Sequence, residues 1–278
     1  PLDKGENIRR EICFAIEEMG LHPEHSHHES GHGQNEVCFR YTTALKSADN
    51  LNTFKSTVKA IAARNGLFAS FMPKPLANQP GSGLHVNVSL LRDGKDLFDG
   101  AFAPDSESGH FVAGILAHAR ELTAFCNPVP NSYARLGANE APLYISWSRQ
   151  NRSQLVRLPS ASGDLCRVEL RGPDPAGNPY LVIGLILAAG LDGIARKLPL
   201  AEPVNRNLFH PSAAAGLESL PRTLREAITV AAQSDFIAAE LPLALQNKYF
   251  EYQTQLCHHY ENAPDPAVWE RTHGFLVI

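Results

Sequence analysis

The sequence predicts an α/β fold in which helices surround a sheet that has a polar face. Segments such as residues 5–19 carry apolar side chains every three or four positions, the spacing of an amphipathic helix. Segments such as 84–91 and 166–171 instead alternate polar and apolar side chains, as half-buried strands do. Proline- and glycine-containing loops separate these segments, and such loops often carry site residues. They lie at residues 73–83, 98–106 and 127–142.

The elements follow one another along the whole chain. Helices are expected at residues 5–19, 47–65, 107–125, 179–197, 221–234 and 241–262. Strands are expected at residues 24–30, 36–42, 67–72, 84–91, 142–149, 155–158 and 166–171. Gly20 is well placed to end the first helix, because glycine readily adopts the left-handed conformation there. With 278 residues, 44% of them hydrophobic, the chain can bury a substantial core as one large domain or two.

Composition and charge argue against several classes of protein. The net charge of −4 gives no indication of a nucleic-acid partner. No signal peptide opens the chain, and its longest apolar run, residues 180–191, is shorter than the roughly 20 residues of a membrane span. The five cysteines form no CxxC pair and are odd in number, which favours a reducing, cytoplasmic setting. They are Cys13, Cys38, Cys126, Cys166 and Cys257.

The strand predicted at 166–171 has a charged face. Arg167, Glu169 and Arg171 share one side, whereas Val168 and Leu170 share the other. A ladder of salt bridges on a wet sheet face would explain this segment taken alone. A second strand with a polar row makes a site for an anion or a metal the better interpretation.

That second strand is predicted at 84–91. His85, Asn87 and Ser89 share one face of it, and Gly81 and Gly83 precede it. Glycines allow a close approach of the backbone to a ligand. A single histidine in a strand is more often structural, but this one, among polar neighbours and after a glycine loop, is a candidate for binding metal or phosphate.

A third polar segment, residues 23–41, is rich in histidine and glutamate. If its two arms form a hairpin around the sequence GHGQN, Glu29 and Glu36 approach each other across the turn. Convergent carboxylates suit a hard divalent cation, magnesium or manganese. The histidines would also suit zinc, but no cysteine lies nearby at a ligand spacing, so oxygen-rich ligation is favoured.

These segments resemble, in their order and in their amino-acid sequence, segments of the catalytic domain of type I glutamine synthetases. The matching stretches are HHESGHGQNE, FMPKPLANQPGSGLHVNVSL, NPVPNSYARL, EAPLYISWSRQNRSQLVRLP and RVELRGPDPAGNPYLVIGLILAAGLDGI. The resemblance implies a curved, mainly antiparallel sheet that forms an open, barrel-like funnel with helices outside. It also implies transfer of the γ-phosphate of ATP to the side-chain carboxylate of glutamate, followed by attack of ammonia on the γ-glutamyl phosphate.

The resemblance assigns metal ligands and substrate residues. Two or more Mg²⁺ or Mn²⁺ ions are implied in each site. Glu29 and Glu36 match ligands of one metal, and His85 and Glu169 match ligands of the other. The residues that match contacts to glutamate are Gly81, Arg135, Glu140 and Arg171, where Glu140 lies on a mobile loop and helps to deprotonate the nitrogen nucleophile.

The resemblance also assigns an ATP side to the site. Glu24, Asn87 and Ser89 match positions there, and Arg152 and Arg157 match arginines at the phosphoryl group and the nucleotide. An ion pair with a nearby acid is the alternative for these two arginines. Because they lie five residues apart in a segment without acids, an external anion is favoured.

Some positions depart from the family pattern. Phe209 stands where some members have a tyrosine that is adenylylated, so regulation by adenylylation is not supported. Pro80 replaces an asparagine before the glycine loop, and Asp164 replaces a lysine, so no ATP role is assigned to Asp164. Arg167 has no assigned role, and we expect it to order its strand through ion pairs.

Full-length members carry an N-terminal β-grasp domain and a first catalytic-domain strand whose paired glutamates give one ligand to each metal. The chain begins just before the helix that normally follows that strand. Residues 1–278 are therefore expected to form the catalytic domain without those parts and to have no useful synthetase activity alone. The full-length protein is expected to form a homo-oligomer, a dodecamer of stacked rings. A γ-glutamyl-polyamine ligase and a non-catalytic structural relative remain alternatives.

Overall fold

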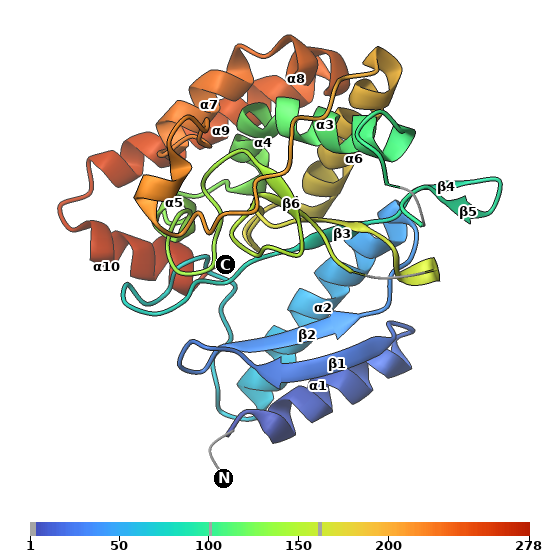
Figure 1. The fold of residues 1–278 in the computed structure, drawn as a ribbon. Helices are drawn as coiled ribbons and strands as arrows, with labels where there is room; N and C mark the ends of the chain where they lie inside the picture. Colours follow the sequence, from blue (N-terminus) through green and yellow to red (C-terminus); the bar gives the residue numbers. More distant parts are fainter. Residues whose placement is uncertain (1–3, 100–101, 161–162) are drawn as a thin grey trace.

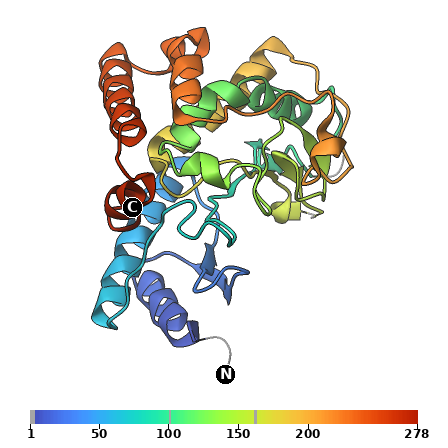
Figure 2. The same ribbon diagram turned by 90° about the vertical axis from the view of Figure 1, so that its left-hand side faces the viewer.

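The computed structural model describes residues 4–99, 102–160 and 163–278. A smaller N-terminal part lies below a larger body in both views of the ribbon (Figures 1 and 2). The smaller part contains helix α1 (Glu6–Glu18), the antiparallel hairpin of β1 (Pro23–His28) and β2 (Asn35–Phe39), and helix α2 (Ala44–Arg64). It is joined to the larger body through α2, where Lys55 Nζ donates a 2.6 Å hydrogen bond to the Pro175 carbonyl.

The hairpin has one apolar and one polar face. Val37 on β2 packs against a buried cluster made of Ile12, Ile16 and Leu21 near α1 and Ile61 on α2. Since successive side chains in a strand point to opposite faces, Glu36 and Cys38 point away from that cluster. The apolar face therefore anchors the hairpin, and the polar face remains available for a site.

The main sheet lies in the larger body. Within the described ranges it has four strands in the order β3-β8-β7-β6. The β3–β8 and β8–β7 pairs are antiparallel, and β7–β6 is parallel, so the expected mainly antiparallel sheet is confirmed. The strands are β3 (Val86–Val88), β8 (Val168–Leu170), β7 (Val156–Leu158) and β6 (Trp147–Arg149). A small hairpin, β4 (Leu91–Arg92) and β5 (Lys95–Asp96), follows β3.

Helices cover the sheet on one side (Figure 1). The central pair is α3 (Glu107–Ala117) and α6 (Pro179–Arg196), which approach closely at glycines: a Cβ on Gly114 would lie 2.1 Å from the Ala189 carbonyl oxygen. By length and composition α6 could cross a membrane, but Val182, Ile186 and Ala189 on it are fully buried in the main core, as in the core helix of a folded domain.

The other helices complete the larger body and the C-terminal region. They are α4 (Ala119–Cys126), α5 (Ser132–Arg135), α7 (Leu224–Ala232), α8 (Asp235–Glu240), α9 (Leu243–Glu261) and α10 (Pro266–Glu270). Short 3₁₀ turns occur at Gly163–Leu165 and Pro211–Ala214, and a π turn at Arg271–Phe275.

Some expected elements differ from the structure. The strand expected at 67–72 is wrong, because Phe71 packs edge-on against Phe54 of α2 and Met72 is buried, so the apolar residues serve packing rather than a sheet. Of the strand expected at 142–149, only the last three residues form a strand of the main sheet, while Tyr144 makes an isolated antiparallel bridge to Ser219. The helix expected at 107–125 is interrupted at His118, whose ring bonds Glu121 and Asp192.

The C-terminal expectations need a smaller correction. The helix expected at 221–234 begins only at Leu224, because Thr223 caps it by accepting a hydrogen bond from the Glu226 amide. The short α8 then precedes α9, which was expected at 241–262 and is observed at Leu243–Glu261.

Candidate active site

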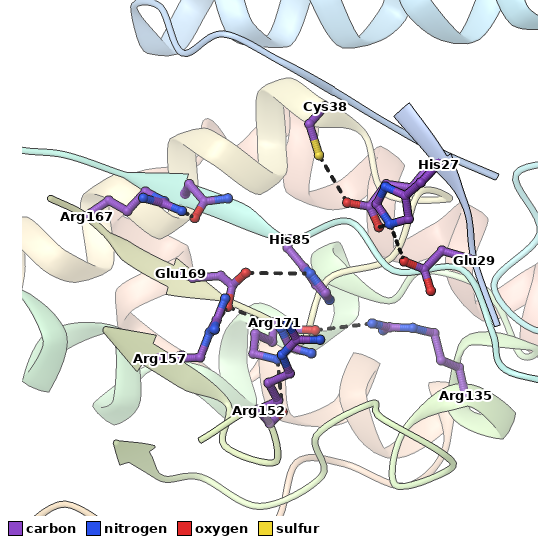
Figure 3. Close-up of polar contacts among 12 residues, drawn as sticks. His27, Glu29, Cys38, His85, Arg135, Arg152, Arg157, Arg167, Glu169 and Arg171 are labelled. Atoms are coloured by element: carbon purple, nitrogen blue, oxygen red, sulfur yellow. Dashed lines mark hydrogen bonds and ion pairs between the residues drawn. The ribbon is translucent and has the colours of Figure 1, made fainter. Parts of the chain in front are cut away.

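The buried carboxylate of Glu169 is the centre of the sheet cluster, which we define as His85, Arg157, Glu169 and Arg171. Glu169 Oε2 accepts hydrogen bonds from Arg157 Nε at 2.6 Å and from Arg171 Nη1 at 3.1 Å. Its other oxygen lies 3.7 Å from His85 Nδ1 (Figure 3). Strand pairing explains the geometry, because Glu169 stands opposite Arg157 on β7 and opposite Asn87 on β3.

Charge and burial fix the protonation of this cluster. Burial alone would raise the pKa of Glu169, but the hydrogen bond from Arg157 and the positive charges of Arg171 and Arg157 bring it below its ordinary value. Burial, followed by the positive charge of Arg171, lowers the pKa of His85 to about 3. At neutral pH the site therefore presents an ionised carboxylate beside a neutral imidazole, the form in which histidine binds metals.

The ion pair of Arg157 corrects one expectation. Its own segment lacks acids, which favoured an external anion as its partner, but the neighbouring strand supplies Glu169. Arg171 also has partners within the protein: its Nε donates to the Arg152 carbonyl at 3.0 Å, and its side chain is 4% exposed. The salt-bridge interpretation of the charged face is thus correct for Glu169 with Arg157 and Arg171. Arg152 is exposed and makes no ion pair within the described part of the chain.

Arg167, the third member of that charged row, lies apart from the cluster. Its Nε donates to Asn87 Oδ1 at 3.0 Å, and its Nη1 donates to the Leu165 carbonyl at 2.7 Å. It therefore orders the strand through hydrogen bonds with neutral acceptors, not through the ion pairs that we expected.

The glycine loop, which contains Gly81 and Gly83, packs against Arg135. Arg135 Nη1 and Nη2 donate to the carbonyls of Gly172 (2.7 Å) and Arg171 (3.2 Å), and burial lowers its pKa to about 10, so it stays charged. A Cβ on Gly83 would lie 2.7 Å from Arg135 Nη2, and one on Gly81 would lie 2.4 Å from the Pro73 carbonyl oxygen. Only glycine fits at these positions, which explains the GSG sequence in structural terms.

The polar face of the hairpin carries the second cluster, which we call the hairpin cluster: His27, Glu29 and Glu36. Their candidate ligand atoms all lie within 4.8 Å of one another. His27 Nε2 is 2.8 Å from Glu29 Oε1 and 4.0 Å from Glu36 Oε2. Burial raises the pKa of Glu29, but its hydrogen bonds with His27, the Ser30 amide and Glu36 together outweigh this effect, and the net shift is downward. Two oxygen donors and an imidazole so arranged fit a hard divalent cation.

The structure thus brings Glu29 and Glu36 together as expected, and it adds His27. Sequence reasoning missed His27, although the signal was present: residues 27 and 29 share a strand face, and His27 pairs with Glu36 across the turn. A hydrogen bond of 2.9 Å from Gln34 Nε2 to the Gly81 carbonyl ties the hairpin turn to the glycine loop. Figure 3 shows His85 between the hairpin cluster and Glu169.

The remaining expected site residues are less closely gathered. Glu24 is exposed beside a bulge in β1, and Ser89 Oγ donates to the Cys166 carbonyl at 2.7 Å. Glu140 is exposed and follows Asn139, whose side chain donates to the Gln79 carbonyl at 3.1 Å.

Two of the positions that depart from the family pattern can also be placed. Phe209 is half-buried, and its amide bonds Asn207. The side chain of Asp164 lies outside the described part of the structure.

Comparisons with known proteins identify the family of this chain. The family model "Glutamine synthetase, catalytic domain" matches residues 1–272. A glutamine synthetase from Methanosarcina mazei is 48% identical over 252 residues, covering 87% of this chain and 56% of the relative. One from Staphylococcus aureus is 43% identical over 282 residues, covering 98% of this chain and 62% of the relative. The chain therefore spans less than two thirds of the length of these curated relatives.

Solved structures show the same fold. The structure described as "GmaS/ADP complex-Conformation 1" has a TM-score of 0.86 at 34% identity and covers 96% of this chain and 63% of that one. The glutamine synthetase of Plasmodium falciparum has a TM-score of 0.85 at 27% identity, with 97% and 61% covered. The matched family model and the curated relatives show that this chain belongs to the glutamine synthetase catalytic-domain family.

Proposed function

We propose that this chain is the catalytic domain of an ATP-dependent ligase that joins ammonia to the side-chain carboxylate of L-glutamate through γ-glutamyl phosphate, giving glutamine, ADP and phosphate. The observation that carries the proposal is the ionised, arginine-bound Glu169 beside neutral His85, facing the carboxylates of the hairpin cluster. Phosphoryl transfer depends on positioned cations and arginines. This arrangement offers ligands for the cations and supplies the arginines.

Each of the two clusters would hold one divalent cation. Glu29 and Glu36, with His27, would hold one Mg²⁺ or Mn²⁺, and His85 and Glu169 would hold another. When bound, these cations would polarise the phosphate oxygens and offset their developing charge. Further ions would enter with the nucleotide, and ATP binding is supported by the likeness to a structure whose description names ADP.

Arginines would hold the anions. Arg152 has no ion-pair partner in the described part of the chain and is exposed, so it is the arginine best placed to meet the phosphoryl group. Arg157 would contact the nucleotide while it orients Glu169. Arg135 and Arg171 would position the glutamate carboxylate, with the backbone of Gly81 beside them.

Other residues would complete the substrate sites. Glu140 would accept a proton from the nitrogen nucleophile, on a loop that excludes water when it closes. Glu24, Asn87 and Ser89 would face the nucleotide. We also propose that the protein acts in the cytoplasm as a homo-oligomer, a dodecamer in its full-length form.

The test uses the full-length protein, because residues 1–278 are expected to have no useful synthetase activity alone. It measures ADP release with ATP, Mg²⁺ and glutamate, in the presence of either ammonia or putrescine. Glutamate-dependent release that is faster with ammonia supports the proposal. Faster release with putrescine would make the protein a γ-glutamyl-amine ligase instead. Absence of both ATP turnover and nucleotide binding would make it a non-catalytic relative.

A matched pair of variants tests the role of Arg152. Arg152→Ala should lower turnover by about a hundredfold or more, the usual cost of losing one charge-stabilising donor. Arg222→Ala removes another exposed arginine, just before the N-cap of α7, and should leave turnover unchanged. Equal turnover in the two variants would remove Arg152 from the mechanism.

A further inference from the structure

Another group of donor atoms lies on the same polar face of the hairpin. The strand register places His25 directly opposite Cys38, two positions along the ladder from the pair of His27 with Glu36. The candidate ligand atoms of His25, Glu36 and Cys38 all lie within 4.8 Å of one another. These three residues therefore offer one nitrogen, one oxygen and one sulfur donor around a common point.

The surroundings of Cys38 favour a cation. Its Sγ donates to Glu36 Oε1 at 3.1 Å. Glu36 and Glu29 lie on the same polar face, and their carboxylates create a negative field in which a metal cation is stabilised.

The backbone that carries these donors is well anchored. Val37, between Glu36 and Cys38, packs into the apolar cluster between the hairpin and the helices α1 and α2. The rings of His25 and His27 stack at a centroid distance of 6.0 Å with an interplanar angle of 19°. The donor set is therefore held by a fixed strand pair, while the exposed ring of His25 can adjust to an ion.

We propose that His25, Glu36 and Cys38 form a binding site for a zinc-type cation, distinct in its chemistry from the hard-cation site of the hairpin cluster. Thiolate and imidazole ligands select Zn²⁺ over Mg²⁺, which prefers oxygen. The three side chains leave the fourth tetrahedral position to water. On binding, the S–H bond of Cys38 breaks, its proton passes to solvent, and the thiolate bonds the metal, so no oxidant or reductant is needed.

Glu36 belongs to both donor sets. Zinc at the new site would engage a carboxylate that the hairpin cluster needs for Mg²⁺ or Mn²⁺, so zinc should weaken binding of the hard cation. This consequence rests on the proposed function of the hairpin cluster, whereas zinc binding itself does not.

The first experiment titrates the protein with Zn²⁺ in excess Mg²⁺, in competition with a chromophoric zinc chelator. Cys38→Ser and His25→Ala should each weaken zinc binding by on the order of tenfold or more, since each removes a direct ligand. Cys13→Ser, at a half-buried cysteine of α1, is the matched control and should bind zinc as the unchanged protein does. Equal affinity in the Cys38 and Cys13 variants would overturn the site.

X-ray absorption of the zinc-loaded protein gives a readout that does not depend on affinity. A sulfur neighbour at about 2.3 Å is expected, and it should disappear in Cys38→Ser. A spectrum with only nitrogen and oxygen neighbours in the unchanged protein would refute the proposal.

Manganese binding, followed by electron paramagnetic resonance, separates this inference from the proposed function. Zinc that binds through Cys38 and displaces Mn²⁺ supports both. Zinc that binds through Cys38 in a protein without Mn²⁺ affinity supports the zinc site and contradicts the hard-cation site. Mn²⁺ binding without zinc binding supports the hard-cation site and contradicts the zinc site.

Discussion

The hairpin cluster and the sheet cluster both combine histidine with glutamate, but their charges are balanced in opposite ways. In the hairpin cluster, Glu29 and Glu36 have only His27 as a positive partner, and all three side chains are at least one third exposed. In the sheet cluster, Glu169 is 8% exposed and already paired with Arg157 and Arg171.

This difference sets an order of binding. The hairpin cluster carries excess negative charge, so a divalent cation can bind it directly. The sheet cluster is positive before any cation arrives, and a further positive charge in a buried place is costly unless an anion comes with it. We therefore expect a cation at His85 and Glu169 only together with the phosphates of a nucleotide.

The largest expected effect comes from removing the buried carboxylate. Glu169→Gln should lower the free energy of unfolding by about 3 kcal/mol, because it leaves two arginines without their counter-charge. Denaturant unfolding measures the loss. Glu29→Gln is the control in the exposed cluster and should change stability by less than about 1 kcal/mol. Similar losses in both variants would contradict the contrast between the clusters.

The pH dependence of that loss follows from the lowered pKa of Glu169. A carboxyl group whose pKa is lowered by folding stabilises the native state above its ordinary value of 4.5 and loses that contribution as pH falls through the folded-state pKa. The stability difference between the unchanged protein and Glu169→Gln should therefore shrink as the pH is lowered below 4.5. A difference that stays constant down to unfolding in acid would show that ionisation is not its cause.

The loop that links the two clusters gives the next effect. Gly81→Ala should cost about 2 kcal/mol, because the added Cβ overlaps the Pro73 carbonyl and crowds Arg135. Thermal unfolding of this variant is compared with that of Gly184→Ala, where the added Cβ meets nothing within 4 Å. The control, in the middle of α6, should be neutral or slightly stabilising. If the thermal stability of Gly81→Ala were unchanged, the loop would not need to lie so close to the Pro73 carbonyl and Arg135.

The smallest effect concerns cation binding without nucleotide. Glu36→Gln should weaken Mn²⁺ binding about tenfold, equivalent to about 1.4 kcal/mol, because it removes a charged oxygen ligand. His85→Ala should leave nucleotide-free Mn²⁺ binding unchanged. Isothermal titration measures both variants, and a weakened His85→Ala protein would show that the sheet cluster also binds a free cation.

Sequence alternation was enough to find residues that share a strand face. It predicted Glu169 beside Arg171, which are hydrogen-bonded, and the turn in GHGQN predicted Glu29 near Glu36, whose ligand atoms converge. Of the predicted row His85, Asn87 and Ser89, only Asn87 lies within the observed strand β3. These predictions work because the period of two in a strand is a local property.

Partners across strands were not predictable in the same way. The pair of Arg157 with Glu169 depends on the β7–β8 register, and the pair of His25 with Cys38 depends on the hairpin register. The absence of a cysteine at a ligand spacing in the sequence led us to discount Cys38, although the hairpin brings it beside a histidine. The interruption at His118 likewise depends on Asp192, which belongs to another helix.

Manganese stoichiometry, measured by electron paramagnetic resonance with and without a non-hydrolysable ATP analogue, tests the contrast between the clusters most directly. Occupancy of about one ion per chain without nucleotide, reduced in Glu36→Gln, should rise when the analogue is added. The additional ions should include one that depends on His85. A His85-dependent ion already bound without nucleotide would contradict the charge argument.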